Sequence, residues 1–220
     1  EYYEPSLLNK IVNLQLEEDN KIIDYWHSIT SFKIIKIIYY IFLSNDENKE
    51  LIIFYFLLNS IKYQDNIIYM RNLNCVNKSL KISHKVSNEN HRFKGFTRFK
   101  ELKNNILYAE ISPDNNILFL LSYHFKNRLK NEYWIIKDTN HEIISLYDKK
   151  RFYIFDSNTL KIKNIELSDN EETIEILWKN FYQTIGIKER KNDRCRMNFM
   201  PKKYWKNIIE MSDEIEKSNN

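Results

Sequence analysis

The chain has 220 residues, of which 43% are hydrophobic, and it carries 34 Lys and Arg against 30 Asp and Glu. This composition supports a hydrophobic core without a disulfide or metal staple. Two glycines exclude a phosphate loop or a dinucleotide fingerprint, and two distant cysteines exclude a zinc ribbon or iron–sulfur cluster built from this chain alone. The longest wholly apolar run, Leu51–Leu58, is too short to span a membrane.

Hydrophobic periodicity predicts mainly helices in the N-terminal third. Residues 11–16 are compatible with a short strand. Residues 32–43 are typical of a buried helix, and a second helix over about 47–63 would form a hairpin with it after a capping turn at residues 44–46. A more polar helix over 73–90 follows.

The central third changes to short strands. Alternation after residue 96 and the Asn104-Asn105 turn signal predict a hairpin over 96–111. A helix from about Pro113 to Leu129 follows, because proline is favoured in the first turn. Three further strands are expected. They cover residues 133–138, 142–148 and 151–156.

Helices over about 170–185 and 201–217 complete the chain. The predicted fold class is α+β, with an antiparallel sheet of about five strands in the centre of the chain, covered by helices from the N- and C-terminal thirds. We expect a single domain over residues 1–211 and a frayed tail over 212–220.

Positive charge is concentrated in two segments. Residues 188–206 contain eight Lys and Arg and two acids, and residues 91–100 contain four and no acid, whereas the rest of the chain is net negative. Cations interleaved with aromatic residues suit a polyanion with flat faces, which is nucleic acid. The predicted nucleic-acid-binding residues are Arg92, Lys94, Arg98, Arg190, Lys191, Arg194, Lys202, Lys203, Tyr204 and Trp205.

A structural reading stands beside this binding reading. The cations could be solvated side chains opposite a core, and the two aromatic residues of the second segment, Tyr204 and Trp205, could pin the C-terminal helix instead of stacking on a base. The hypothesis requires both segments to fold into one surface.

Four residues are candidates for acid–base chemistry. Glu89 and His91 lie close together where a helix meets the sheet, and a carboxylate can tune an imidazole for proton transfer. His124 shares a helix face with Arg128, where the two could hold a phosphate, and Asp138 could orient a base. The alternative is that these groups are buried and separately paired. No metal-ligand spacing is present among the five histidines, so we predict no metal and no cofactor.

Seven blocks give the chain a resemblance to a known family. They are Glu89-x-His91-Arg92-Phe93-Lys94-Gly95-Phe96-x-Arg98-Phe99, Leu107-Tyr108-Ala109-x-Ile111-x-Pro113, His124-Phe125-x-x-Arg128, Trp134-Ile135-Ile136-x-Asp138, Trp178-Lys179-x-Phe181, Arg190-x-Asn192-x-Arg194 and Phe199-Met200-Pro201-Lys202-Lys203-Tyr204-Trp205. The chain resembles a bacterial family of DNA metabolism proteins, a domain of unknown function. Relatives usually begin with a further N-terminal segment, which we expect to be lacking here.

The resemblance implies a role in DNA repair and several partners. These are DNA, a radical S-adenosylmethionine enzyme similar to spore photoproduct lyase, and a uracil-DNA-glycosylase-like protein. The leading expectation is a cytoplasmic DNA-binding accessory protein. One alternative is a glycosylase- or nuclease-like hydrolase using Glu89 and His91, and another is a non-catalytic protein-binding scaffold.

Overall fold

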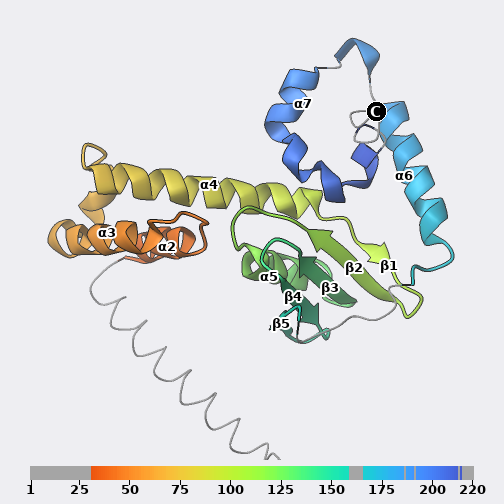
Figure 1. The fold of residues 1–220 in the computed structure, drawn as a ribbon, viewed down its shortest axis with the longest axis horizontal. Coiled ribbons are helices and arrows are strands. Elements are labelled where there is room, and N and C mark those ends of the chain that lie inside the picture. Colours follow the sequence, from red (N-terminus) through yellow and green to blue (C-terminus); the bar gives the residue numbers. More distant parts are fainter. Residues whose placement is uncertain (1–30, 159–165, 186, 191, 213, 215–220) are drawn as a thin grey trace, which may run out of the picture. The chain divides into compact units, whose positions relative to one another are not determined.

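The structure is a computed structural model that describes residues 31–158, 166–185, 187–190, 192–212 and 214. The chain divides into two compact units between Val86 and Ser87. Helices make up the described part of the first unit, and the second contains a five-stranded sheet with further helices (Figure 1). The strand predicted over residues 11–16 lies outside the described residues. The single domain expected over residues 1–211 stays a prediction.

The first unit confirms the predicted helical hairpin. Helix α2 (Phe32–Phe42) and helix α3 (Lys49–Tyr63) are followed by the 3₁₀ helix η1 (Gln64–Tyr69) and the start of α4 (Asn74–Phe96). The unit has its own hydrophobic core, because one fully buried side chain comes from each of these four elements. They are Ile34, Phe56, Ile67 and Val76.

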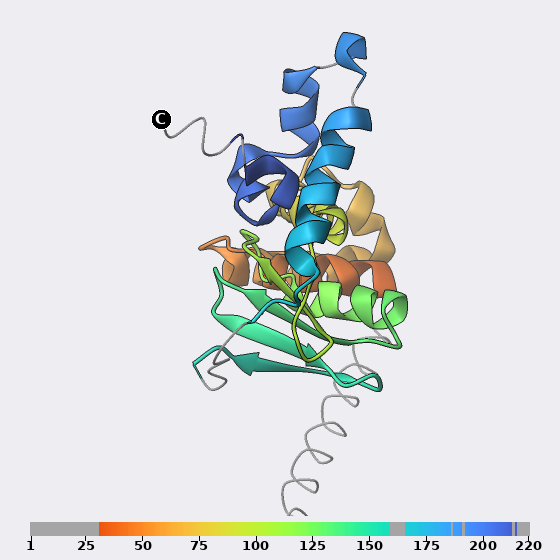
Figure 2. The ribbon, with the colours of Figure 1, turned by 90° about the vertical axis from the view of Figure 1, so that its right-hand side faces the viewer.

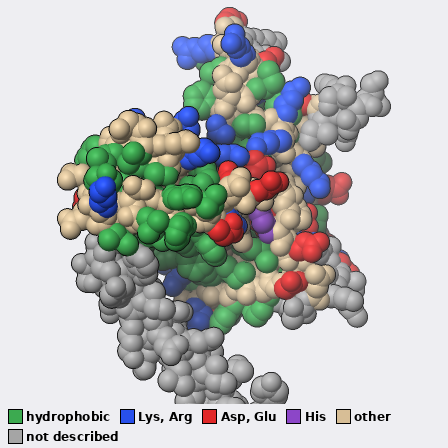
Figure 3. All heavy atoms as spheres, turned by 60° about the vertical axis from the view of Figure 1, so that its left-hand side comes forward, with side chains coloured by type: hydrophobic (Ala, Val, Ile, Leu, Met, Phe, Trp, Pro, Cys, Tyr) green, Lys and Arg blue, Asp and Glu red, His purple; other side chains and the backbone are tan. Residues whose placement is uncertain are grey.

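Helix α3 also exposes apolar side chains. Leu51, Phe54, Leu58 and Ile61 are each about half exposed. Figure 3 shows hydrophobic side chains on the surface of this unit. No helix among the described residues combines the length and apolar character that crossing a bilayer requires.

Helix α4 extends six residues beyond the predicted end at residue 90. Its last turn is closed by Thr97, whose backbone N–H and hydroxyl both donate to the carbonyl of Phe93, at 3.1 and 2.7 Å. The strand expected from residue 96 therefore begins only at Lys100. The turn predicted at Asn104-Asn105 is present, and Asn105 adopts a positive φ of 58°, which asparagine tolerates better than most residues.

The sheet has the predicted number of strands, in the order β1-β2-β3-β4-β5. The strands are β1 (Lys100–Glu101), β2 (Ile106–Ile111), β3 (Tyr133–Asp138), β4 (Ile143–Tyr147) and β5 (Phe152–Asp156). Three neighbouring pairs are antiparallel, whereas β2 and β3 are parallel. The α+β class with a central sheet and flanking helices is confirmed, and one parallel pair is added to it.

Helix α5 (Leu118–Arg128) explains the parallel pair. A strand that follows a crossover helix returns to the sheet in the same direction as the strand before it. Figure 2 shows α5 lying against one face of the sheet, and the buried hydroxyl of Ser122 donates to that of Ser145 on β4 at 2.7 Å. Trp134 stacks on Tyr147 with ring centroids 5.0 Å apart, so aromatic packing joins β3 to β4.

The C-terminal region differs most from expectation. Helix α6 (Glu171–Ile185) is confirmed, and it is followed by η2 (Lys188–Arg190) and α7 (Asp193–Phe199), which was not predicted. The helix expected over 201–217 is wrong over residues 202–211, which form two 3₁₀ segments, η3 (Lys202–Asn207) and η4 (Ile209–Met211). Residues 213 and 215–217 of that prediction lie outside the described residues.

Three buried residues anchor these 3₁₀ segments. Trp205, Ile208 and Met211 are nearly or fully buried and form one hydrophobic cluster. Trp205 belongs to η3 and Met211 to η4, so both segments contribute to this cluster. Ile208 itself is extended, at φ −109° and ψ 108°, and therefore separates the two segments.

Candidate nucleic-acid interface

The two basic segments lie next to each other in the second unit. The Arg92 Nη2 on α4 donates to the carbonyl oxygen of Asn198 on α7 at 3.2 Å. The rings of Phe93 and Tyr204 are 5.0 Å apart in an edge-on arrangement, and Phe96 packs against the cluster that contains Trp205. Segments about 100 residues apart in sequence are therefore in direct contact.

The two aromatic residues predicted to stack on bases are not exposed. Tyr204 is 5% and Trp205 is 4% accessible. Tyr204 donates its hydroxyl to Glu89 at 2.6 Å, and the Trp205 indole N–H donates to the carbonyl of Met200 at 2.9 Å. The stacking prediction is wrong for both residues in this structure. Both rings attach the C-terminal region to the rest of the unit, because their apolar surfaces are buried and their polar atoms are hydrogen-bonded there.

Two of the predicted phosphate contacts are neutralised by acidic neighbours. Arg98 forms a two-pronged ion pair with Glu210, with contacts of 2.5 and 3.2 Å. Lys203 is hydrogen-bonded to the carboxylate of Asp114. A cation that is already paired contributes less field to an incoming phosphate, so these two side chains are weaker candidates than their sequence positions indicate.

Other predicted cations have no carboxylate within ion-pairing distance in the part of the chain that the structure describes. These are Arg92, Lys94, Arg190, Arg194 and Lys202. Lys191 lies outside the described residues. Figure 3 shows Lys and Arg side chains gathered over the C-terminal region, where α7 lies.

Arg92, Arg194 and Lys202 are connected through α7 and η3. Arg194 lies on α7, one helical turn before Asn198, whose backbone carbonyl binds Arg92. The Lys202 ammonium lies 5.7 Å from the ring centre of Trp205, on which the Arg196 guanidinium also packs at 5.2 Å. We call Arg92, Arg194 and Lys202 the α7 cation group.

Lys94 belongs to a different group. Its positive charge acts on the His124 side chain of α5, as does that of Arg128. Partial burial lowers the pKa of His124 below its ordinary value of 6.5, and Lys94 and Arg128 lower it further. Among the described residues Arg128 forms no ion pair with Asp138 or Asp148, whose carboxylates accept other donors.

This lowered pKa gives a testable pH dependence. Because the folded protein binds the His124 proton less tightly than the unfolded chain does, the free energy of unfolding should fall as pH drops below about 6.5. Replacing Lys94 with Met should raise the His124 pKa and weaken that dependence. NMR titration of the His124 ring measures its pKa, and denaturant unfolding at several pH values measures the free energy of unfolding. An unchanged His124 pKa in the variant would contradict the electrostatic effect of Lys94.

Glu89 is buried at 3% accessibility and is fully engaged in hydrogen bonds. Its carboxylate accepts the backbone N–H groups of Asp114 and Asn115 at 2.9 and 3.0 Å, the side-chain amide of Asn115, and the Tyr204 hydroxyl at 2.6 Å. These donors occupy both oxygens. Burial raises the pKa of Tyr204, and its bond to Glu89 raises it further, so the hydroxyl remains a donor. Glu89 holds α4, the loop before α5 and η3 together.

Asp138 is engaged in the same way. It has no accessible surface, and its carboxylate accepts the backbone N–H groups of Asn140 and His141 and the His141 ring nitrogen, at 3.0, 3.2 and 2.8 Å. These bonds form the turn between β3 and β4. The geometry required for the hydrolase alternative, with open and converging acids and bases, is therefore absent for Glu89 and Asp138. His91 is exposed on α4.

Sequence reasoning missed the acids that decide which cations are available. Asp114, Glu210 and Glu214 pair with Lys203, Arg98 and Arg196, from positions 18 to 112 residues away. No local pattern reveals such pairs. Helix α7 did carry a signal, because the Asn192 side chain accepts the Cys195 N–H at 2.9 Å as an N-cap.

Comparison with known protein families places most of the chain in one of them. Residues 47–210 match the model of a family described as a domain of unknown function, DUF4130. The matched range covers more than half of the chain and includes all seven sequence blocks. No curated protein and no solved structure matches the chain. The chain belongs to the DUF4130 family.

Proposed function

We propose that this protein binds DNA through the α7 cation group and acts as an accessory protein in DNA metabolism. The observation that carries the proposal is the contact between the two basic segments, made by Arg92 and the Asn198 carbonyl. It places Arg92 against α7, the helix that carries Arg194, and Lys202 follows that helix at the start of η3. Such a group attracts phosphates without reading sequence.

The test is DNA binding by the full chain at several salt concentrations. Fluorescence anisotropy with single- and double-stranded DNA between about 50 and 200 mM salt should show affinity that falls steeply with salt. The variant Arg194→Ala/Lys202→Ala should weaken binding to all sequences and lower the log–log salt slope by about 2, since each phosphate contact contributes about 1.

Lys203 provides a matched control. It adjoins Lys202 and is similarly exposed, but it is paired with Asp114. Lys203→Ala should therefore change DNA affinity less than Lys202→Ala does. Equal losses for both lysines would show that net charge alone governs binding. Unchanged DNA affinity in the Arg194→Ala/Lys202→Ala variant would remove the α7 cation group from the proposal. If the chain bound an acidic protein and not DNA, the alternative of a non-catalytic protein-binding scaffold would be favoured.

The partners we propose are those that the sequence resemblance implies. They are a radical S-adenosylmethionine repair enzyme and a uracil-DNA-glycosylase-like protein, which would act with this chain on DNA in the bacterial cytoplasm. Support comes from the sequence blocks, which all fall within the DUF4130 match. Analytical ultracentrifugation of this protein mixed with such an enzyme, with and without DNA, tests the association. No complex under either condition would contradict it.

A further inference from the structure

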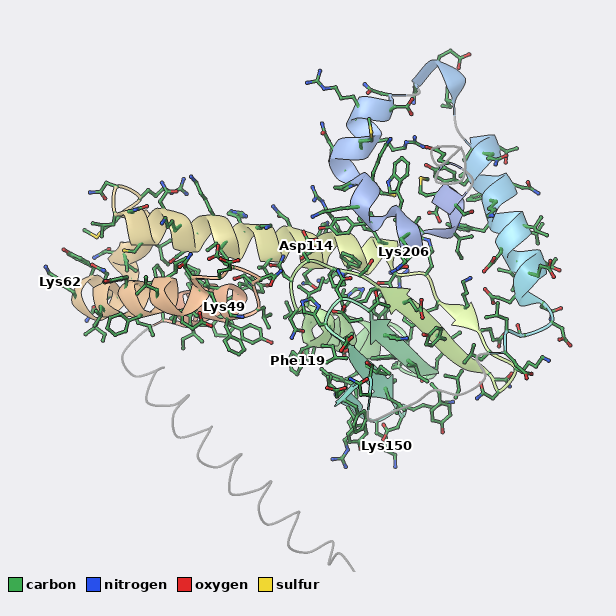
Figure 4. The ribbon with its side chains drawn as sticks, in the orientation of Figure 1. Lys49, Lys62, Asp114, Phe119, Lys150 and Lys206 are labelled. Carbon is green, nitrogen blue, oxygen red and sulfur yellow. The ribbon has the colours of Figure 1, made fainter. Side chains whose placement is uncertain are left out.

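A cavity of about 510 Å³ lies in the second unit, separate from the α7 cation group. Its walls come from β1 and β2 on one side, α6 on another, and η3 and η4 on a third. Figure 4 labels Lys206, which contributes to the cavity from the η3 segment beside β2. This volume is within the range of small-molecule sites, which is about 300–1,000 Å³.

The lining of the cavity includes one cation, Lys206, that is available to an anionic group. Four cations line it, namely Arg98, Lys100, Lys179 and Lys206, against two carboxylates, Glu110 and Glu175. Arg98 is held by Glu210, and Lys100 contacts Glu175 at 2.5 Å. Lys206 is exposed and has no carboxylate within ion-pairing distance among the described residues. Its ammonium is the group best able to take a phosphate.

The wall of the cavity formed by β2 carries a hydrogen-bond acceptor instead of a cation. The Tyr108 hydroxyl donates to Glu110 Oε1 at 2.6 Å. Burial raises the pKa of Tyr108, and Glu110 raises it further, so this proton stays on tyrosine. The Glu110 carboxylate therefore presents acceptor oxygens to the cavity. Because carboxylates accept and cannot donate when ionised, this wall selects a ligand with N–H groups.

The apolar part of the lining completes the site. Leu167, Ile208 and Ile209 contribute hydrophobic surface, which suits the face of a planar ring. The site therefore offers a cation for a phosphate, an acceptor for an amino group and an apolar wall for a ring. These features match the parts of one nucleotide whose base carries an exocyclic amine.

We propose that this cavity binds one nucleotide unit of a nucleic acid, with its phosphate on Lys206 and its base amino group on Glu110. The inference rests on the proposed DNA binding and specifies how a single unit, at a strand end or turned out of the stack, would be held. The α7 cation group would bind the rest of the strand. Adenine, cytosine and guanine offer an exocyclic amine with two N–H donors to Glu110, whereas thymine offers only its single ring N3–H.

Calorimetric titration of the full chain with dAMP, dTMP, deoxyadenosine and inorganic phosphate tests the proposal. We expect dAMP to bind more tightly than each of the other three. The Trp178 indole donates to Glu210, which holds the lining residue Arg98, so its NMR signal should shift with dAMP and report the location of binding.

Two variants test the two contacts. Lys206→Ala should weaken dAMP binding by about tenfold or more, as the loss of a charge-assisted contact does. Lys203→Ala is the matched control, because Lys203 is also exposed in η3 but is paired with Asp114 and does not line the cavity. Glu110→Gln should reduce the preference for dAMP over dTMP, and thermal unfolding of each variant confirms that it folds.

Several outcomes would overturn the inference. They are no binding of dAMP at millimolar concentration, phosphate alone binding as tightly as dAMP, or dAMP binding that survives Lys206→Ala. None of them contradicts the proposed DNA binding, which fails if the full chain shows no DNA binding in the anisotropy titration. The two proposals can therefore fail independently.

Discussion

Replacing Glu89 with alanine should lower the free energy of unfolding by about 3–5 kcal/mol. The side chain is buried, and it accepts two backbone N–H groups, the Asn115 side-chain amide and the Tyr204 hydroxyl. Alanine would leave these donors without partners and would open a cavity. Denaturant unfolding of the full chain, followed by circular dichroism, measures the change.

Two further variants separate the contributions to this effect. Tyr204→Phe removes one donor and should cost about 1–2 kcal/mol. Glu89→Gln keeps the shape but turns an amide N–H₂ toward groups that are themselves donors, so it should destabilise more than Tyr204→Phe. Glu132→Ala, at an exposed position, serves as the control and should change little.

The same series distinguishes a structural from a catalytic Glu89. A structural carboxylate predicts that stability and any activity fall together. If Glu89→Ala retained wild-type stability and lost a DNA-processing activity, the hydrolase alternative would replace the structural reading. The location of Glu89 at a junction of three elements makes the stability loss the expected result.

The helices whose cores are local in sequence could be predicted well. Helices α2, α3 and α6 lie within two residues of their predicted bounds at each end, because apolar spacing and flanking turn residues determine them. The start of α5 could not be predicted. The N–H groups of Asp114 and Asn115 bind Glu89, which lies 25 and 26 residues earlier, and the helix begins only at Leu118.

The candidate site could be predicted in part. The binding hypothesis required the two basic segments to meet, and Arg92 does contact the backbone of Asn198. Which cations remain available depends on acids far away in sequence, as with Arg98 and Glu210, which are 112 residues apart. The burial of Tyr204 and Trp205 is likewise a tertiary effect. The sequence composition identifies the two basic segments, whereas only the folded structure shows which of their cations are paired with acids.

Replacing Arg98 with alanine should lower the free energy of unfolding by about 2–4 kcal/mol. The Glu210 side chain is 4% accessible and that of Arg98 is 23% accessible. Without Arg98, the buried carboxylate keeps the Trp178 indole N–H, at 3.1 Å, as its remaining side-chain donor among the described residues. The Arg98 guanidinium also packs on the Trp178 ring at 5.7 Å, so the variant loses packing as well as charge.

Two comparisons test whether loss of the Arg98–Glu210 ion pair causes the lower stability of Arg98→Ala. Lys103→Ala removes an ion pair with Glu166 whose side chains are both more than half exposed, and it should have little effect, as is usual for surface pairs. Arg98→Met/Glu210→Leu removes both charges and should recover part of the stability lost in Arg98→Ala. A double variant less stable than Arg98→Ala would contradict an unpaired carboxylate as the origin.

The difference in the free energy of unfolding between wild type and Arg98→Ala should depend on pH, and this dependence tests the role of the ion pair most directly. Burial tends to raise the pKa of Glu210, but the hydrogen bonds and charge of Arg98 outweigh it, so the folded-state pKa lies below the ordinary 4.5. The unfolded chain therefore takes up this proton first as pH falls. The stability that the pair contributes should be fully present above about pH 4.5 and should be lost as pH falls through the folded-state pKa. Wild type and Arg98→Ala should accordingly converge in acid, and a difference independent of pH would assign the loss to packing on Trp178.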